Sequence, residues 1–308
     1  MLVGAPERWD EACFAVPAVR AVLAAGLGTG VICREDQREI WQSVTGLEVL
    51  AFPEKTKAKA VALANKDSWQ AALLWEPGMA AEVIKLMNVP RQLGPANGKL
   101  RKQITQPLGI SNNPLEHRVR FYLAAVEEMG ITTFNPEFFA PVALGIERLT
   151  NAVLISPDSD FGPSHEWPLN QWLEITNRLI TAGYQITVAG GCGGRGLGAA
   201  MATKLGPGVK FVADLLLGGA LSLLAAQRVV IAADGSLPHL AAHVGATCVT
   251  LFGPNDGAWK RPLGRRHLVV WRHVECAPCL LAKCPLDMRC QRELTPDMVW
   301  AAVQEVLA

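Results

Sequence analysis

The chain has 308 residues, of which 50% are hydrophobic and 19% are charged. This composition predicts folded domains, because disordered chains are poor in hydrophobic residues and rich in net charge. The net charge of +1 provides no overall attraction to polyanions, so we predict no nucleic-acid partner. Residues 1–14 lack a basic segment followed by an apolar one, and we expect a cytoplasmic protein.

The first half of the chain alternates short apolar segments with helical patterns. The apolar segments have the length of buried strands and cover 1–6, 30–35, 48–52 and 71–75. Helical spacing of apolar residues is present before residue 26, over 79–87 and from about 114 to 130.

The same alternation restarts after the proline-containing stretch 136–141. Strands are predicted at 151–157, 184–191, 209–214, 228–234 and 248–254. Helices are predicted at 167–183, 196–206, 217–227, 237–245 and 296–307.

Fully apolar strands that alternate with helices are typical of parallel sheets covered on both faces. We therefore predict an α/β protein with two Rossmann-like, doubly wound domains that face a central cleft. The expected domains are 1–142 and 150–292, followed by a C-terminal helix at 293–308. Ligands of such sheets bind outside the carboxyl ends of the strands, which directs attention to the loops that follow them.

One such loop follows the apolar strand 228–234. Asp234 ends the strand, and Gly235 and Ser236 open the next helix. Exposed amides and the positive end of the helix dipole can bind a diphosphate there. The alternative is an ordinary junction in which Ser236 caps the helix.

A second loop, 156–168, carries His165 and also joins a strand to a helix. A protonated His165 would neutralise a leaving diphosphate, although a lone loop histidine is more often simply exposed.

A glycine-rich loop contains Gly191, Gly193 and Gly196, with Asp214 further on. This spacing resembles the dinucleotide-binding fingerprint and makes a nicotinamide oxidoreductase an alternative hypothesis. The loop follows the second strand of its domain, whereas that fingerprint belongs to the first.

Four cysteines occur close together near the C-terminus, at Cys276, Cys279, Cys284 and Cys290. Four thiolates at this spacing could bind a structural zinc ion or an iron–sulfur cluster. The alternatives are reduced thiols or one disulfide in a proline-rich loop.

The segments 155–168 and 233–257 together resemble the bacterial lipopolysaccharide heptosyltransferases, glycosyltransferase family 9. Residues 88–94 and 117–131 and the stretch around Pro17 are similar to further segments of that family. The resemblance implies a GT-B fold whose first domain binds the acceptor and whose second domain binds an ADP-sugar. It also implies inverting transfer with no cofactor required for catalysis, and closure of the two lobes to exclude water.

The resemblance assigns roles to individual residues. By counting back from Pro17, Glu11 takes the place of the family's catalytic aspartate and Asp10 that of the preceding glycine, and either could accept the acceptor proton. The alternative role for both is to favour the N-terminus of the first helix. His165 replaces a family lysine, and Asp234, Gly235 and Ser236 replace an Asp-Ser/Thr-Gly sequence. Asp234 and His239 would shape the donor pocket.

Basic residues in the first domain include Arg91, Lys99 and Arg101. Around an acceptor site they could recognise the phosphates of a glycan or lipid-linked acceptor at the inner membrane face. The alternative for each of them is a solvated charge on a loop. The altered family positions motivate a further hypothesis, a non-catalytic GT-B protein that binds a sugar nucleotide or glycan.

Overall fold

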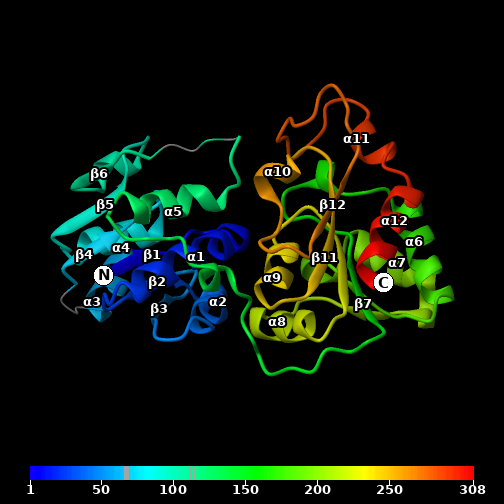
Figure 1. Cartoon of the computed structure of the whole chain (residues 1–308), viewed down its shortest axis with the longest axis horizontal. Helices are drawn as coiled ribbons and strands as arrows, with labels where there is room; N and C mark the ends of the chain where they lie inside the picture. The colour runs from blue at the N-terminus through cyan, green and yellow to red at the C-terminus, as the bar shows by residue number, and fades with distance from the viewer. Residues whose placement is uncertain (66–68, 111–112, 114) are drawn as a thin grey trace. The chain divides into compact units, whose positions relative to one another are not determined.

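The structure is a computed structural model that describes residues 1–65, 69–110, 113 and 115–308. It divides into two compact units, Met1–Ala140 and Pro141–Ala308. Each unit contains a parallel β-sheet with helices packed on it (Figure 1). The predicted α/β class with two parallel, doubly wound sheets is therefore confirmed.

The described strands of the first unit form a six-stranded sheet in the order β3-β2-β1-β4-β5-β6. These strands are β1 (Leu2–Gly4), β2 (Gly30–Arg34), β3 (Glu48–Phe52), β4 (Ala71–Leu73), β5 (Arg91–Pro95) and β6 (Gln106–Leu108). Val3 is in register with Val31 of β2 and with Leu73 of β4, and all three are fully buried. The order is that of a Rossmann sheet. All strands are parallel, and the order in which the chain adds them reverses between β1 and β4, which is the topological switch point.

Helices cover both faces of this sheet. They are α1 (Trp9–Ala24), α2 (Arg38–Gln42), α3 (Ala58–Ala64), α4 (Met79–Leu86) and α5 (Val119–Glu127), with 3-10 turns η1 (Glu35–Gln37), η2 (Leu100–Lys102) and η3 (Pro136–Phe139). Helix α5 lies within the predicted helix 114–130, whose residue 114 is outside the described residues. The predicted strand 71–75 is shorter than expected because Leu74 and Trp75 leave the strand while remaining buried.

The second unit repeats the design. Its described strands have the order β12-β11-β10-β7-β8-β9, so the topological switch point lies between β7 and β10. They are β7 (Ala152–Ser156), β8 (Gln185–Ala189), β9 (Lys210–Val212), β10 (Val229–Ala233), β11 (Thr247–Phe252) and β12 (Leu268–Trp271). Residues of β7 and β10 are buried along their whole length, because helices lie on both faces of the sheet.

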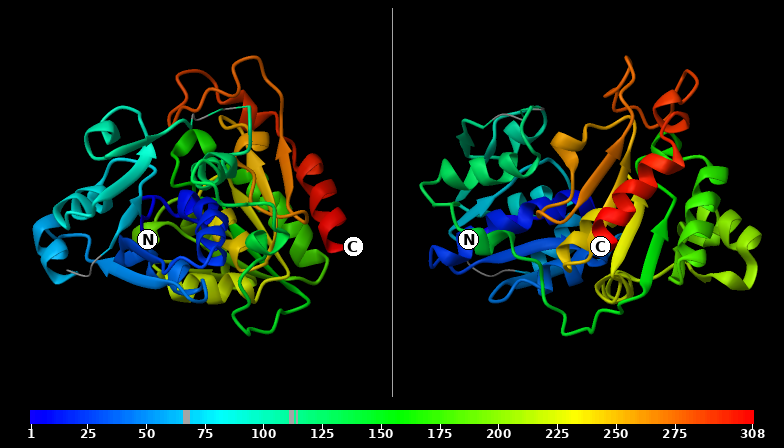
Figure 2. Two further views of the ribbon diagram at one scale, coloured as in Figure 1. Left: turned by 60° about the vertical axis from the view of Figure 1, so that its left-hand side comes forward. Right: turned by 45° about the vertical axis from the view of Figure 1, so that its right-hand side comes forward.

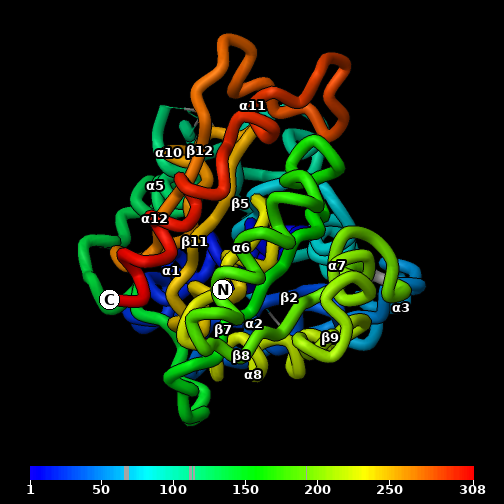
Figure 3. The backbone as a smooth tube through the Cα atoms, turned by 90° about the vertical axis from the view of Figure 1, so that its right-hand side faces the viewer, coloured from blue at the N-terminus to red at the C-terminus, as the bar shows by residue number. Residues whose placement is uncertain are grey.

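The helices of the second unit are α6 (Leu169–Thr181), α7 (Leu197–Leu205), α8 (Leu217–Ala225), α9 (Leu237–His243), α10 (Gly257–Lys260), α11 (Arg289–Arg292) and α12 (Pro296–Leu307), with 3-10 turns η4 (Pro163–His165), η5 (Cys192–Gly194) and η6 (Gly206–Gly208). Trp167 and Trp172 anchor the core with their rings 5.2 Å apart. Helix α12 packs against α6 through the same core, to which it contributes Val299 and Val303 (Figure 3). No helix in the described ranges has the length and apolarity needed to cross a bilayer.

Candidate functional site

The second unit brings two predicted site residues together at the topological switch point of its sheet. His165 lies in η4, after β7, and Asp234 directly follows β10. His165 Nδ1 and Asp234 Oδ2 are 2.9 Å apart, and both side chains are almost completely buried. The carboxyl ends of β7 and β10 are thus joined by an imidazole–carboxylate pair, at the position where doubly wound sheets bind ligands.

Asp234 has one satisfied and one unsatisfied oxygen. Its Oδ2 also accepts a hydrogen bond of 2.6 Å from Asn255 Nδ2, in the loop after β11. Its buried Oδ1 has no hydrogen-bond partner among the described residues. Burial raises the pKa of Asp234, although hydrogen bonds from His165 and Asn255 and the charge of Lys260 act in the opposite direction. A buried carboxylate oxygen without a donor is unusual and indicates a place for a ligand group or water.

The backbone amide of Ser236, which the sequence predicts to bind a diphosphate, is bonded to the carboxylate of Asp160 in this structure. Ser236 donates to Asp160 twice, from its amide at 2.8 Å and from its hydroxyl at 2.6 Å. A Cβ added at Gly235 would lie 2.8 Å from Asp160 Oδ1, so glycine permits this approach. Asp160 therefore binds the amide that the sequence assigned to a phosphate, and a diphosphate would have to replace it there.

Two further side chains complete the buried surroundings of this pair. His239, one turn into α9, is 2% exposed. Lys260 is buried at the end of α10, with its ammonium 5.3 Å from the ring centre of Phe161. The sequence analysis missed Asp160, Asn255 and Lys260. The last two follow strand β11, so the rule that loops after strands bind ligands would have found them.

The glycine-rich loop uses its amides internally. Asp158 accepts hydrogen bonds from the amides of Gly191, Leu197 and Gly198, at 2.6–3.1 Å. Asp214, the residue that would contact a ribose, accepts from the Gly193 amide at 2.7 Å. Because these groups already have partners, the arrangement does not favour a nicotinamide dinucleotide.

In the first unit, Asp10 and Glu11 lie in the first turn of α1 and are 0% and 7% exposed. Glu11 Oε2 accepts hydrogen bonds from Arg118 Nε at 2.7 Å and from the Tyr122 hydroxyl at 2.5 Å. Asp10 accepts from Arg8 Nε at 3.0 Å. Both carboxylates therefore already have hydrogen-bond partners within the first unit.

A third carboxylate, that of Glu76, lies in the loop after β4, one of the two strands at the topological switch point of the first sheet. Glu76 follows β4, and its Oε1 accepts the Glu7 amide from the loop after β1 at 2.7 Å. Burial raises the pKa of Glu76, and the charges of Glu11 and Glu7 act in the same direction. The sequence analysis missed Glu76, although its position directly after an apolar strand was a usable signal.

The predicted acceptor-binding residues lie at different ends of the first sheet. Arg91 begins β5 and is therefore at its amino end, where it donates to Gln106 at 3.2 Å. Lys99 and Arg101 lie in and beside η2, after the carboxyl end of β5. Only Lys99 and Arg101 share the edge of the sheet that carries Glu7 and Glu76.

The four clustered cysteines occupy the loop after β12, which extends beyond the end of the sheet (Figure 2), and helix α11. Burial raises the pKa of Cys290 to about 11, and Cys276, Cys279 and Cys284 contribute in the same direction. The thiols are therefore near one another. Within the described part of the chain, however, no three or more histidine, cysteine or acidic side chains are arranged to hold a metal ion.

Comparisons with known proteins agree with this geometry. The profile of glycosyltransferase family 9 (heptosyltransferase) matches residues 135–289. Lipopolysaccharide heptosyltransferase 2 of Escherichia coli strain K12 is 29% identical over 119 residues, which is 37% of this chain and 34% of that protein. The match thus spans about a third of the relative's length.

Two solved structures share the fold over the whole chain. The structure of E. coli ADP-heptose lipopolysaccharide heptosyltransferase II has a TM-score of 0.80 at 18% identity, covering 99% of this chain and 98% of that one. E. coli heptosyltransferase WaaC with ADP-2-deoxy-2-fluoro heptose has a TM-score of 0.75 at 16% identity, with the same coverage of both chains. At these identities the likeness establishes the fold.

Proposed function

The chain belongs to glycosyltransferase family 9, and from this membership we propose that it transfers a heptose-like sugar from an ADP-sugar to a lipopolysaccharide-core or related glycan. One observation carries the proposal: Asp234 keeps a buried carboxylate oxygen without a donor, at the edge of the sheet where ligands bind. A hydroxyl group of the donor sugar would supply the missing hydrogen bond. The two E. coli structures support this choice of donor, since one is an ADP-heptose heptosyltransferase and the other contains ADP-2-deoxy-2-fluoro heptose.

The second unit would bind the donor. Gly235 and Ser236 would contact the diphosphate after it replaces Asp160, and His165, when protonated, would stabilise the charge that develops on the leaving group. His239 and Asp234 would enclose the sugar. The new bond forms between the acceptor oxygen and the anomeric carbon as the bond from that carbon to the diphosphate breaks, with inversion.

The first unit would bind the acceptor. Lys99 and Arg101 would contact acceptor phosphates at the carboxyl edge of the sheet, whereas Arg91 lies at the opposite end and is not carried forward. Glu11 or Asp10 would accept the proton of the attacking hydroxyl. Their carboxylates now accept hydrogen bonds from Arg118, Tyr122 and Arg8, so this role requires those hydrogen bonds to loosen when the acceptor binds.

The experiment is calorimetric titration with ADP and ADP-heptose, paired with mass spectrometry of truncated lipopolysaccharide cores. We expect both ligands to bind. Asp234→Asn should lower the affinity for ADP-heptose about tenfold and the affinity for ADP less, since the lost contact is with the sugar. Asp297→Asn, an exposed carboxylate on α12, is the control. Failure of both ligands to bind the unaltered protein would refute the proposal.

A non-catalytic binder of a sugar nucleotide or glycan is the second candidate. Two observations favour it. Asp160 accepts a hydrogen bond from the Ser236 amide, and Glu11 accepts hydrogen bonds from Arg118 and Tyr122. Donor binding without product over the whole set of acceptors would select this candidate.

We also propose that the cysteine loop binds a structural zinc ion or iron–sulfur cluster, apart from catalysis. The proximity of the four thiols supports it, whereas their present arrangement does not have ligand geometry. Metal analysis of the protein as purified tests this. A bound metal that is lost in Cys279→Ser is expected, and a metal-free protein would contradict it.

A further inference from the structure

A cavity of about 430 Å³ lies within the second unit, apart from the His165–Asp234 pair. Its walls come from the loop after β11 with α10, from the end of β12, and from the start of the cysteine loop. This volume is sufficient for a monosaccharide or a short part of a glycan.

An aromatic corner forms one wall of the cavity. Trp271, the last residue of β12, keeps 55% of its surface exposed. The ring of His273 meets the indole at 85°, with 6.0 Å between ring centres. The exposed indole thus presents a large apolar face at the side of the cavity.

The floor of the cavity is apolar and requires glycine. A Cβ at Gly257 would lie 2.5 Å from Val269 Cγ1, so only glycine allows α10 to pack this closely on β12. The cavity thereby presents Val269 beside the indole. An apolar floor with an exposed aromatic face favours a ligand that has one apolar side.

The polar groups of the cavity are nearly balanced in charge. Asp256 and Arg261 carry opposite charges. His267 accepts the Cys248 amide at Nδ1, and burial lowers its pKa to about 4, so its ring is neutral near pH 7. A balanced cavity gives a phosphate or other anion little advantage, and it favours a neutral ligand with hydroxyl groups.

Asn255 connects the cavity to the candidate donor site. It lines the cavity and donates to Asp234 Oδ2 at 2.6 Å. A ligand in the cavity would therefore be separated by one side chain from the carboxylate proposed to bind the donor sugar.

We propose that this cavity is a subsite for a neutral pyranose ring, with the sugar stacked on Trp271 and its hydroxyls bound by Asn255 and Asp256. This subsite goes beyond the proposed function, because it lies in the second unit, whereas the acceptor is proposed to bind the first. The subsite itself does not depend on catalysis.

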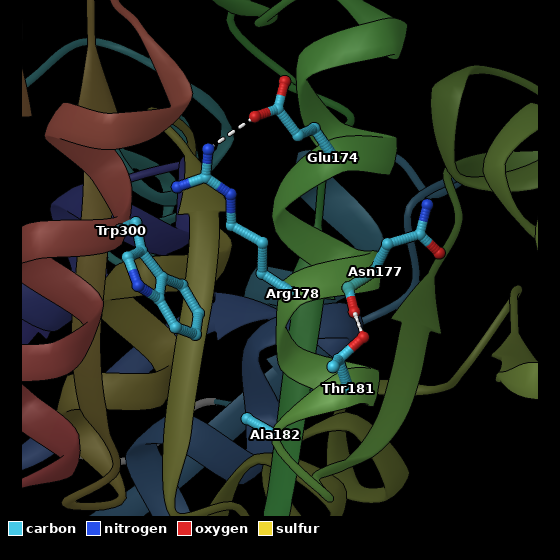
Figure 4. Close-up of a pocket in the computed structure, with 6 residues that line it drawn as sticks. All are labelled: Glu174, Asn177, Arg178, Thr181, Ala182 and Trp300. Carbon is cyan, nitrogen blue, oxygen red and sulfur yellow. Dashed lines mark hydrogen bonds and ion pairs between the residues drawn. The ribbon is translucent and has the colours of Figure 1, made fainter.

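The test is saturation-transfer NMR with methyl glycosides of common hexoses, and separately with adenosine. We expect sugar signals for the unaltered protein and at least tenfold weaker binding for Trp271→Ala. Trp300→Ala is the matched control, because Trp300 lines another shallow pocket of the same unit, between α6 and α12 (Figure 4). Thermal unfolding of both variants establishes that they are folded.

Glycoside binding at the cavity and ADP binding at the candidate donor site are measured independently on the same samples. ADP titration on the same samples should be unchanged by Trp271→Ala, since the tryptophan is outside the candidate donor site. If ADP binds but no glycoside does, or if Trp271→Ala leaves glycoside binding intact, the subsite is refuted and the proposed function survives. Binding of adenosine with loss in Trp271→Ala would also overturn it, in favour of a base-binding pocket.

Discussion

His165 and Asp234 are 69 residues apart in the chain, and their side chains meet at 2.9 Å. They do so because β7 and β10 are neighbours in the sheet, with Ile155 in register with Ile231. The loops that leave the carboxyl ends of these strands are therefore adjacent. The family resemblance places a lysine at the histidine position, so the pair offers a direct test of leaving-group stabilisation.

Replacing His165 by lysine should raise transfer activity at pH 8. A lysine ammonium is a full positive charge at this pH and would stabilise the charge that develops on a leaving diphosphate. Next to Asp234 the ammonium would have a buried counter-ion. Initial rates of ADP release at pH 8 measure the effect. Lower activity in the variant than in the unaltered protein, with both proteins folded, would contradict it.

Replacing Glu11 by glutamine should lower the free energy of unfolding by about 3 kcal/mol, because the buried guanidinium of Arg118 loses its counter-charge. The two side chains are only 9% and 12% exposed. The matched control is Glu35→Gln, which breaks the exposed pair with Arg38 and should change stability by less than about 1 kcal/mol. Urea denaturation compares the two, and equal losses would argue against a buried pair.

The sequence predicts strands such as β7 and β10, because the apolar segments 152–156 and 229–233 can only be buried between layers. It does not predict β5, β6 or β12, which lie at or next to the edges of the two sheets. It also places His165 and Asp234 correctly at strand ends. It could not show that Asp160 reaches the Ser236 amide, since that contact depends on the path of the loop 157–168, which has three prolines and a glycine. Glu76 and Asn255 each follow a predicted strand, so the rule on loops after strands pointed to both, but the sheet order is what brings them to their sites.

The buried imidazole of His267 predicts a loss of stability in acid. Burial lowers its pKa from 6.5 to about 4, so the folded state disfavours the protonated form that the unfolded chain adopts. The unfolded state therefore binds more protons between pH 6.5 and about 4, and stability falls as the pH decreases through this range. The full shift corresponds to about 3 kcal/mol. Since part of the ring is exposed, we expect about 2 kcal/mol, measured as the difference in unfolding free energy between pH 7 and pH 4.

The control for that measurement is a second histidine of the same cavity. His267→Gln should reduce the acid-dependent loss by most of this amount, and His273→Gln is the matched substitution at an exposed position of the same cavity. Equal profiles for the two variants would show that the acid sensitivity arises elsewhere.

Asp160→Asn should strengthen ADP binding about tenfold. In the unaltered protein the carboxylate accepts the Ser236 amide and hydroxyl, and a diphosphate must displace it and then tolerate its negative charge nearby. Asparagine keeps the size of the side chain, but hydrogen bonds to a neutral oxygen are weaker by about 1 kcal/mol or more than those to a carboxylate. Asp297→Asn serves again as the control, because its carboxylate is 84% exposed and pairs with Arg178 on α6. Titration at low and high salt separates charge repulsion, which salt screens, from the loss of the hydrogen bonds. Weaker ADP binding in Asp160→Asn would instead assign Asp160 a supporting role in the donor site, and the displacement step would then have to be abandoned.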